Sequence, residues 1–217
     1  MTAKMIDSIT VDRDQIYKGA GRLVVSDPDT LTSFPGRLES IMNPATPVSG
    51  TAYALASGWS DLGPTSEDGI VIRREAELSE GIAIDQRNTP LDEGEPDSWA
   101  MAMECTMMAT SLANINKAWE AGMLRNHDAD STHVAQSVLD LDAPASFTER
   151  MIAVIQEDTK SGKLRAFAFR KAVPAVDGSE MNIQSGEATG LPVTFTLKAD
   201  EDISQGSGQF GRIYEEG

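Results

Sequence analysis

Apolar and polar residues alternate with a period of two in several segments of the chain, and turns rich in Gly, Pro and Asp separate these segments. The alternation is clearest in 191–199, where Val193, Phe195 and Leu197 are each followed by a polar residue. Such a pattern places one face of a strand on a core and the other face in solvent. The sequence therefore predicts a mainly β protein, an antiparallel β-sandwich or partly closed barrel.

Eight other segments are candidate strands. The segment 150–157 is apolar on both parities, which is typical of a central strand buried on both faces. The segments 69–78 and 82–87 both alternate and are separated by a Ser-Glu-Gly turn, so we expect them to form a hairpin. The remaining candidates are 21–26, 99–107, 134–139, 164–173 and 181–184.

Helical spacing of apolar residues is found in the segment 111–121. Leu112, Ile115 and Trp119 fall on one face of that helix. Ser111 can cap its N-terminus and Gly122 can end it. We therefore expect one α-helix flanking the sheet. The preceding segment 34–68 is rich in Pro and Gly and has no sustained period, which predicts a long loop insertion.

Composition and charge narrow the picture. The chain has 217 residues, of which 40% are hydrophobic, and no internal repeat divides it, so we expect a single domain over 1–217. Its 18 basic and 34 acidic residues give a net charge of −16, which disfavours a basic patch that grips DNA or anionic lipid. The segment 1–14 lacks an apolar signal region and no stretch is long enough to span a membrane, so we expect a soluble product.

The tail contains a literal GxGxxG at Gly206, Gly208 and Gly211. In a dinucleotide site these glycines lie between a strand and a helix, and an acidic residue follows about 20 positions later. Only six residues follow Gly211, so the motif is rejected. We expect a flexible C-terminal tail over 204–217 instead.

Candidate metal and catalytic residues are few. His127, Asp128, Asp130 and His133 could be drawn as a metal cluster, but they are expected to form a polar loop after the helix. The single cysteine, Cys105, belongs to the apolar 99–107 stripe and excludes a disulfide within the chain. No nucleophile and base have a recognisable spacing. We therefore expect no catalytic residues, no cofactor and no metal, and a protein that is not an enzyme.

Residues 58–72 read GWSDLGPTSEDGIVI, in which a Gly- and Asp-rich approach leads into an alternating strand. An acidic turn at 92–97 precedes Trp99, and the expected helix follows. Together with 17–23 (YKGAGRL), these segments resemble the major tail proteins, or tail tube proteins, of long-tailed, non-contractile bacteriophages. The resemblance is dense over 17–121 and weaker in the rest of the chain.

The resemblance implies a subunit that assembles into hexameric rings, which stack to form the phage tail tube. In such a tube the inner sheets of six subunits surround a lumen, and double-stranded DNA passes through it during ejection without specific binding. The implied location is the virion tail, after synthesis in the host bacterial cytoplasm, with no membrane contact. The implied partners are further copies of the chain and the tail terminator, tail tip and tape-measure proteins.

Two surfaces are assigned from this resemblance. An acidic lumen would repel phosphates over about 8 Å, the Debye length at physiological salt. The polar face of the expected hairpin supplies the candidate lumen residues, which are Arg73, Glu75, Glu77, Asp85 and Arg87.

The 34–68 loop carries more apolar side chains than a solvent loop needs, so we expect it to contact a neighbouring subunit or ring. The alternative is that the loop folds back onto its own domain. The candidate contact residues are Phe34, Leu38, Ile41, Met42, Tyr53, Leu55 and Trp59.

Two other classes of function stay open. One is another virion or secretion-tube ring component, such as a head-decoration protein or a tail terminator. The other is an acidic β-sandwich that acts as a binding module or an enzyme. Electron microscopy of concentrated protein separates the three classes, because they predict tubes, isolated rings or trimers, and monomers respectively.

Overall fold

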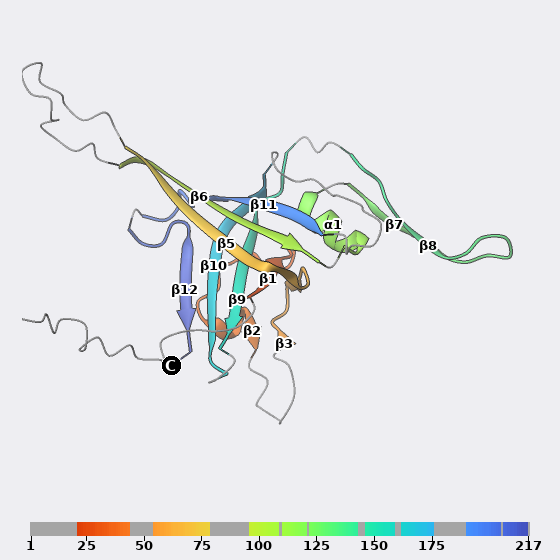
Figure 1. The fold of residues 1–217 in the computed structure, drawn as a ribbon, viewed down its shortest axis with the longest axis horizontal. Coiled ribbons are helices and arrows are strands. Elements are labelled where there is room, and N and C mark those ends of the chain that lie inside the picture. Colours follow the sequence, from red (N-terminus) through yellow and green to blue (C-terminus); the bar gives the residue numbers. More distant parts are fainter. Residues whose placement is uncertain are drawn as a thin grey trace, which may run out of the picture.

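The computed structural model describes residues 21–43, 54–78, 96–108, 110–120, 122–142, 146–158, 162–175, 190–204 and 206–216. Its main feature is a large, strongly bent antiparallel sheet with one flanking helix (Figure 1). This confirms the predicted fold class, a mainly β, antiparallel sandwich-like structure. Within the described residues the sheet does not close, because β4 and β5 form its two edges.

The order of the strands in the sheet is β4-β1-β9-β10-β11-β6-β5, and β12 pairs with β10 beside this path. The strands are β1 (Gly21–Ser26), β4 (Trp59–Asp61), β5 (Thr65–Leu78), β6 (Pro96–Met107), β9 (Arg150–Glu157), β10 (Leu164–Pro174), β11 (Leu191–Lys198) and β12 (Gly211–Glu215). The strands β1, β6, β9, β10 and β11 lie where the sequence predicted them. The candidate strand 181–184 lies outside the described residues.

The first hydrophobic core lies where the two halves of the bent sheet face each other. Leu23 of β1, Met103 of β6 and Phe195 of β11 are buried together there. The helix α1 (Leu112–Trp119) packs against this core through Ile115 and Ala118. As predicted, Ser111 caps the helix, because its hydroxyl accepts a hydrogen bond from Asn114 N at 3.2 Å.

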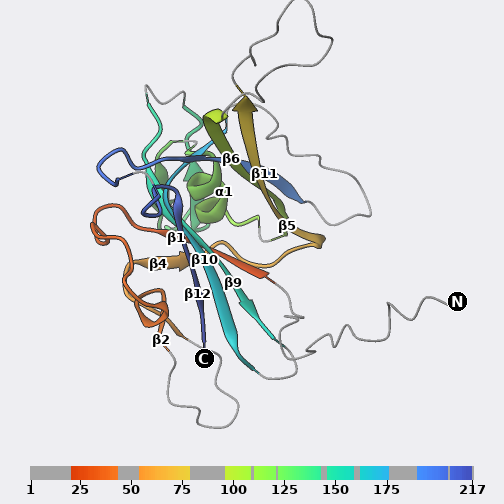
Figure 2. The ribbon, with the colours of Figure 1, turned by 90° about the vertical axis from the view of Figure 1, so that its left-hand side faces the viewer.

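A second core lies on the opposite face of β1, β9 and β10. The segment after β1 folds over this face as the short 3₁₀ helix η2 (Leu38–Ser40), β2 (Met42–Asn43) and β3 (Ala54–Leu55). In Figure 2, β12 runs alongside β10 on the same side of the molecule as β2. Because both faces are covered, β9 is buried along most of its length, as its sequence predicted.

The predicted hairpin of 69–78 and 82–87 falls only in part on described residues. β5 begins four residues earlier than expected, and its partner is β6, with Ile72 opposite Met103 and Glu75 opposite Ala100. The residues 82–87 lie outside the described part of the chain. The pairing of 69–78 with 82–87 therefore stays a prediction, whereas the pairing of β5 with β6 is observed.

The C-terminal tail, which was expected to be flexible, contains β12. Its glycines have backbone roles: Gly206 and Gly208 adopt positive φ angles of 82° and 83°. A Cβ atom on Gly211 would lie 2.0 Å from Ala168 O, so only glycine allows β12 to approach β10 here. Tyr214 Oη donates a hydrogen bond to Pro35 O at 2.5 Å and ties β12 to the second core.

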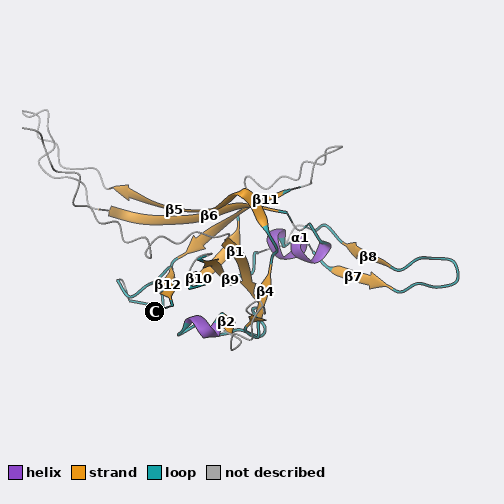
Figure 3. Cartoon of the chain, turned by 60° about the horizontal axis from the view of Figure 1, so that its bottom comes forward, coloured by secondary structure: helices purple, strands orange, loops and turns teal. Residues whose placement is uncertain are grey.

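A separate hairpin of β7 (Leu124–His127) and β8 (Gln136–Leu139) follows the helix. The sequence predicted β8 but read β7 as part of a polar loop, because Arg125, Asn126 and His127 lack alternation. Gly122 at its base adopts φ 147°, and a Cβ atom there would lie 2.1 Å from Asp140 O. The hairpin projects from the body next to α1 (Figure 3).

Candidate assembly surfaces

The residues that carry the phage-tail resemblance link the two cores. Trp59 is buried in the second core, and its indole Nε1 donates to Ser40 O at 3.0 Å. Three residues later, Leu62 is fully buried in the first core. Asp61 between them pairs with Arg22 of β1 and accepts a hydrogen bond from Gly63 N at 2.8 Å. This motif therefore has a structural role at the edge of the sheet.

The candidate lumen residues that are described lie on the solvent face of β5. Arg73 and Glu75 are exposed there, whereas Ile70 and Ile72 on the other face pack against the first core. Arg73 Nη2 forms an ion pair with Glu104 Oε2 of β6 at 3.1 Å. The structure thus places Arg73 and Glu75 on one face together with Glu104.

The structure says less about the other three candidate lumen residues, Glu77, Asp85 and Arg87. The backbone of Glu77 continues the β5–β6 ladder opposite Ser98. Asp85 and Arg87 lie outside the described residues. Sequence reasoning missed Glu104, although the alternation that buries the odd positions of 99–107 places Glu104 on the solvent face. The role of this face in a lumen stays a prediction.

The apolar side chains of the 34–68 segment pack on the chain's own sheet. Ile41, Met42 and Trp59 are buried in the second core, so they are not free to contact a neighbour, which corrects that prediction for these residues. Tyr53 lies outside the described residues. The segment packs on its own sheet because β9 and β10 present a second apolar face that must be covered. Three further residues are half-buried against the same core: Phe34, Leu38 and Leu55.

An apolar groove opens between the β5–β6 hairpin and the β10–β12 pair, with a volume of about 690 Å³. The guanidinium of Arg74 stacks over the Trp99 ring at 3.9 Å from its centroid, yet Trp99 remains 40% exposed. Ile213 of β12 lines the groove and is 67% exposed, and Arg212 lies beside it. The other apolar lining residues are Ile72, Met101, Phe167, Phe169 and Phe210.

The β7–β8 arm, residues 123–141, exposes apolar side chains to solvent. Val134 is 80% exposed, Leu141 77% and Met123 62%. β7 and β8 pair with each other, and within the described chain they form a sheet of their own. A two-stranded hairpin is marginally stable by itself, so such an arm gains stability when a further surface covers it.

The histidine-containing segment forms a tight turn at the tip of this arm. Asp130 Oδ1 accepts hydrogen bonds from Thr132 N at 2.7 Å and His133 N at 2.8 Å, and the His133 ring lies 3.0 Å from the same carboxylate. The Thr132 amide above all, followed by the His133 ring, lowers the pKa of Asp130 to about 2. The tip therefore carries a negative charge throughout the physiological pH range.

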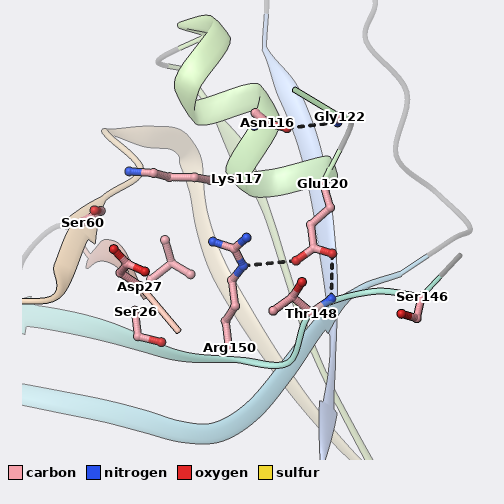
Figure 4. A pocket seen from close by; sticks show the side chains of 11 residues that line it. Ser26, Asp27, Ser60, Asn116, Lys117, Glu120, Gly122, Ser146, Thr148 and Arg150 are labelled. Carbon is pink, nitrogen blue, oxygen red and sulfur yellow. Dashed lines mark hydrogen bonds and ion pairs between the residues drawn. The ribbon is translucent and has the colours of Figure 1, made fainter. Parts of the chain in front are cut away.

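A polar pocket of about 520 Å³ lies where α1 ends against β9 (Figure 4). Glu120 ends the helix in the left-handed conformation, a position for which the sequence favoured Gly122. Its carboxylate is bound on both oxygens, by Arg150 Nε at 3.1 Å and by Thr148 N at 2.8 Å. Since both oxygens are engaged, this carboxylate holds the helix on the sheet and is not set up as a general base.

Cys105 is also not activated. It is 8% exposed in the first core, and burial raises the pKa of its thiol to about 12. A nucleophilic cysteine needs the opposite shift. Within the described ranges, no three His, Cys, Asp or Glu residues gather as a metal site would require. Nor does a helix there have the length and apolar character needed to cross a membrane.

Comparison with known proteins adds no identification. No protein family and no curated protein matches this chain significantly. The tail-tube interpretation therefore depends on the sequence motifs given above and on the surfaces described here.

Proposed function

We propose that this protein is a structural subunit of a phage tail tube, which self-assembles into stacked hexameric rings around a lumen for double-stranded DNA. The observation that carries the proposal is β5, a strand of 14 residues at the edge of the sheet. Its outer edge has no partner strand among the described residues. A long unpaired edge is a template for another chain, and proteins that stay monomeric usually shorten or cover it.

The solvent face of β5, β6 and β11 supports the lumen assignment. Apart from the half-exposed Val71, its described side chains are mostly small or polar, including Ala102, Thr194 and Thr196 between the charged residues of β5. Arg73 is neutralised by Glu104, which leaves Glu75 as the uncompensated charge among these residues. Such a wall offers DNA no basic patch to which its phosphates could adhere.

Electron microscopy of the concentrated full chain tests the proposal. Long hollow tubes with a regular ring repeat are the expected result. Isolated rings or trimers would overturn the tube and favour a terminator or decoration protein. Monomers at all concentrations would overturn self-assembly and favour a binding module.

A further inference from the structure

The β7–β8 arm and the apolar groove lie at opposite ends of the molecule. In Figures 1 and 3 the arm extends from the end that carries α1, whereas β12, which forms one wall of the groove, lies toward the opposite end of the molecule. An arm so placed cannot reach the groove of its own subunit. The two surfaces can meet only between separate copies.

The two surfaces are complementary in apolar character. The arm presents Val134, Leu141 and Met123, three of the most exposed large apolar side chains among the described residues. The groove presents Trp99 and Ile213, which are also exposed. Single exposed apolar residues are ordinary, but several of them along one two-stranded arm, together with an exposed apolar groove, indicate contact surfaces.

The two surfaces are also complementary in charge. The tip of the arm carries Asp128 and Asp130, and the latter is anionic at physiological pH. The groove carries Arg74 and Arg212, and no ion pair with a carboxylate is found for either within the described residues. The lack of a carboxylate partner for these two guanidinium groups among the described residues is notable in a chain with a net charge of −16, because arginine binds carboxylates strongly.

We propose that the β7–β8 arm of one subunit docks into the apolar groove of a second copy of this chain, in a head-to-tail contact. The inference rests on the proposed self-assembly and specifies which surfaces meet. Because the two surfaces differ, each copy uses its arm on one neighbour and its groove on the other. A contact of this kind closes into a ring or continues as a helix.

Two single variants test this directly. Val134→Asp disables the arm but leaves the groove, and Ile213→Asp disables the groove but leaves the arm. Both sites are largely exposed, so circular dichroism and melting temperature should match those of the original protein. Thr32→Asp, which adds the same charge at an exposed position outside β5, the arm and the groove, is the control and should assemble normally.

Sedimentation of the variants alone and mixed gives the result. Each variant alone should self-associate roughly tenfold or more weakly than the original protein. A 1:1 mixture should form dimers and no larger species, because one intact arm meets one intact groove. Arg212→Glu in place of Ile213→Asp should give the same outcome if the apolar substitution disturbs β12.

Other outcomes overturn the inference. The arm–groove contact is wrong if the folded variants assemble normally or if their mixture yields no dimer. It is also wrong if the original protein stays monomeric. Tubes formed by both variants would refute the arm–groove contact and leave the proposed function standing. Dimers from the mixture without tubes from the original protein would support the contact and refute the tube.

Discussion

At the scale of single residues, Gly122 shows how closely the β7–β8 arm is joined to the body. Its amide donates to Asn116 Oδ1 of the helix at 3.1 Å, and its missing side chain leaves room for Asp140 O. We predict that Gly122→Ala lowers the free energy of unfolding by about 2 kcal/mol or more, through backbone strain and a steric clash. Urea unfolding measures this change.

The control for this substitution is Gly36→Ala. No atom lies within 4 Å of a Cβ at that position, and its φ is not in the left-handed region. Its free energy of unfolding should change by less than about 0.5 kcal/mol. Equal effects of the two changes would contradict the role given to Gly122.

Cys105 predicts a pH dependence of stability. Because its pKa is raised in the folded state to about 12, the thiol contributes stability that is complete below the unfolded pKa near 9 and is lost as the pH rises toward 12. The slope due to this group should be about 1.4 kcal/mol per pH unit in that window. Between pH 8 and 11, the free energy of unfolding measured with urea should fall more steeply with pH for the original protein than for Cys105→Ala. Equal slopes for the two proteins would contradict this prediction.

At the scale of elements, the sequence predicted those strands whose side chains alternate or are apolar throughout. β9 and β11 belong to this group, because burial on two faces or on one leaves a local pattern in the sequence. The start of β5 at Thr65 was missed because Thr65–Asp68 is polar on both parities. β12 was missed because its glycines resemble a flexible tail, although Gly211 is needed for close approach to β10.

The ordered state of β12 can be tested at Tyr214. We predict that Tyr214→Phe lowers the melting temperature by about 2–4 °C, since it removes one hydrogen bond worth about 1 kcal/mol and leaves Pro35 O without that donor. Scanning calorimetry measures the shift. Ile213→Ala, at an exposed position of the same strand, should leave the melting temperature unchanged. If Tyr214→Phe also leaves it unchanged, the result would favour a flexible tail.

At the scale of the whole molecule, neither strand pairing nor assembly could be read from local periodicity. The apolar content of the 34–68 segment predicted burial of Ile41 and Trp59, but it did not distinguish their own subunit from a neighbour. The apolar groove could not be predicted from the sequence either. Trp99 and Ile213 are distant in the sequence, and only the tertiary fold brings them to one site.

The buried thiol allows the predicted lumen to be probed. Because Cys105 is inaccessible, Glu75→Cys introduces one reactive thiol on the solvent face of β5. We predict that a maleimide on a large polymer labels this thiol in free subunits but not in assembled tubes, because the polymer cannot enter the lumen. Asp29→Cys, in the exposed turn after β1, should be labelled in both states, and labelling of Glu75→Cys throughout would place that face outside the tube.

Net charge predicts the response of assembly to salt. Two subunits with a charge of −16 repel each other, and this repulsion is screened as the Debye length falls from about 30 Å at 10 mM to about 8 Å at 150 mM salt. Sedimentation should therefore show association at lower protein concentration in 150 mM than in 10 mM NaCl. A weaker association at higher salt would mean that local ion pairs outweigh the net charge.

The pairing of β1 with β9 affects how the chain matures on the ribosome. Met151 N donates to Ser26 Oγ at 2.9 Å across 125 positions, and β1 lies between β4 and β9 in the sheet. Translation at about 5–20 residues per second separates the emergence of these two strands by roughly 6–25 s. Neither core can be completed during this interval, and a chain truncated before β9 also lacks the β10–β12 wall of the groove, so we predict that it does not join the proposed assembly.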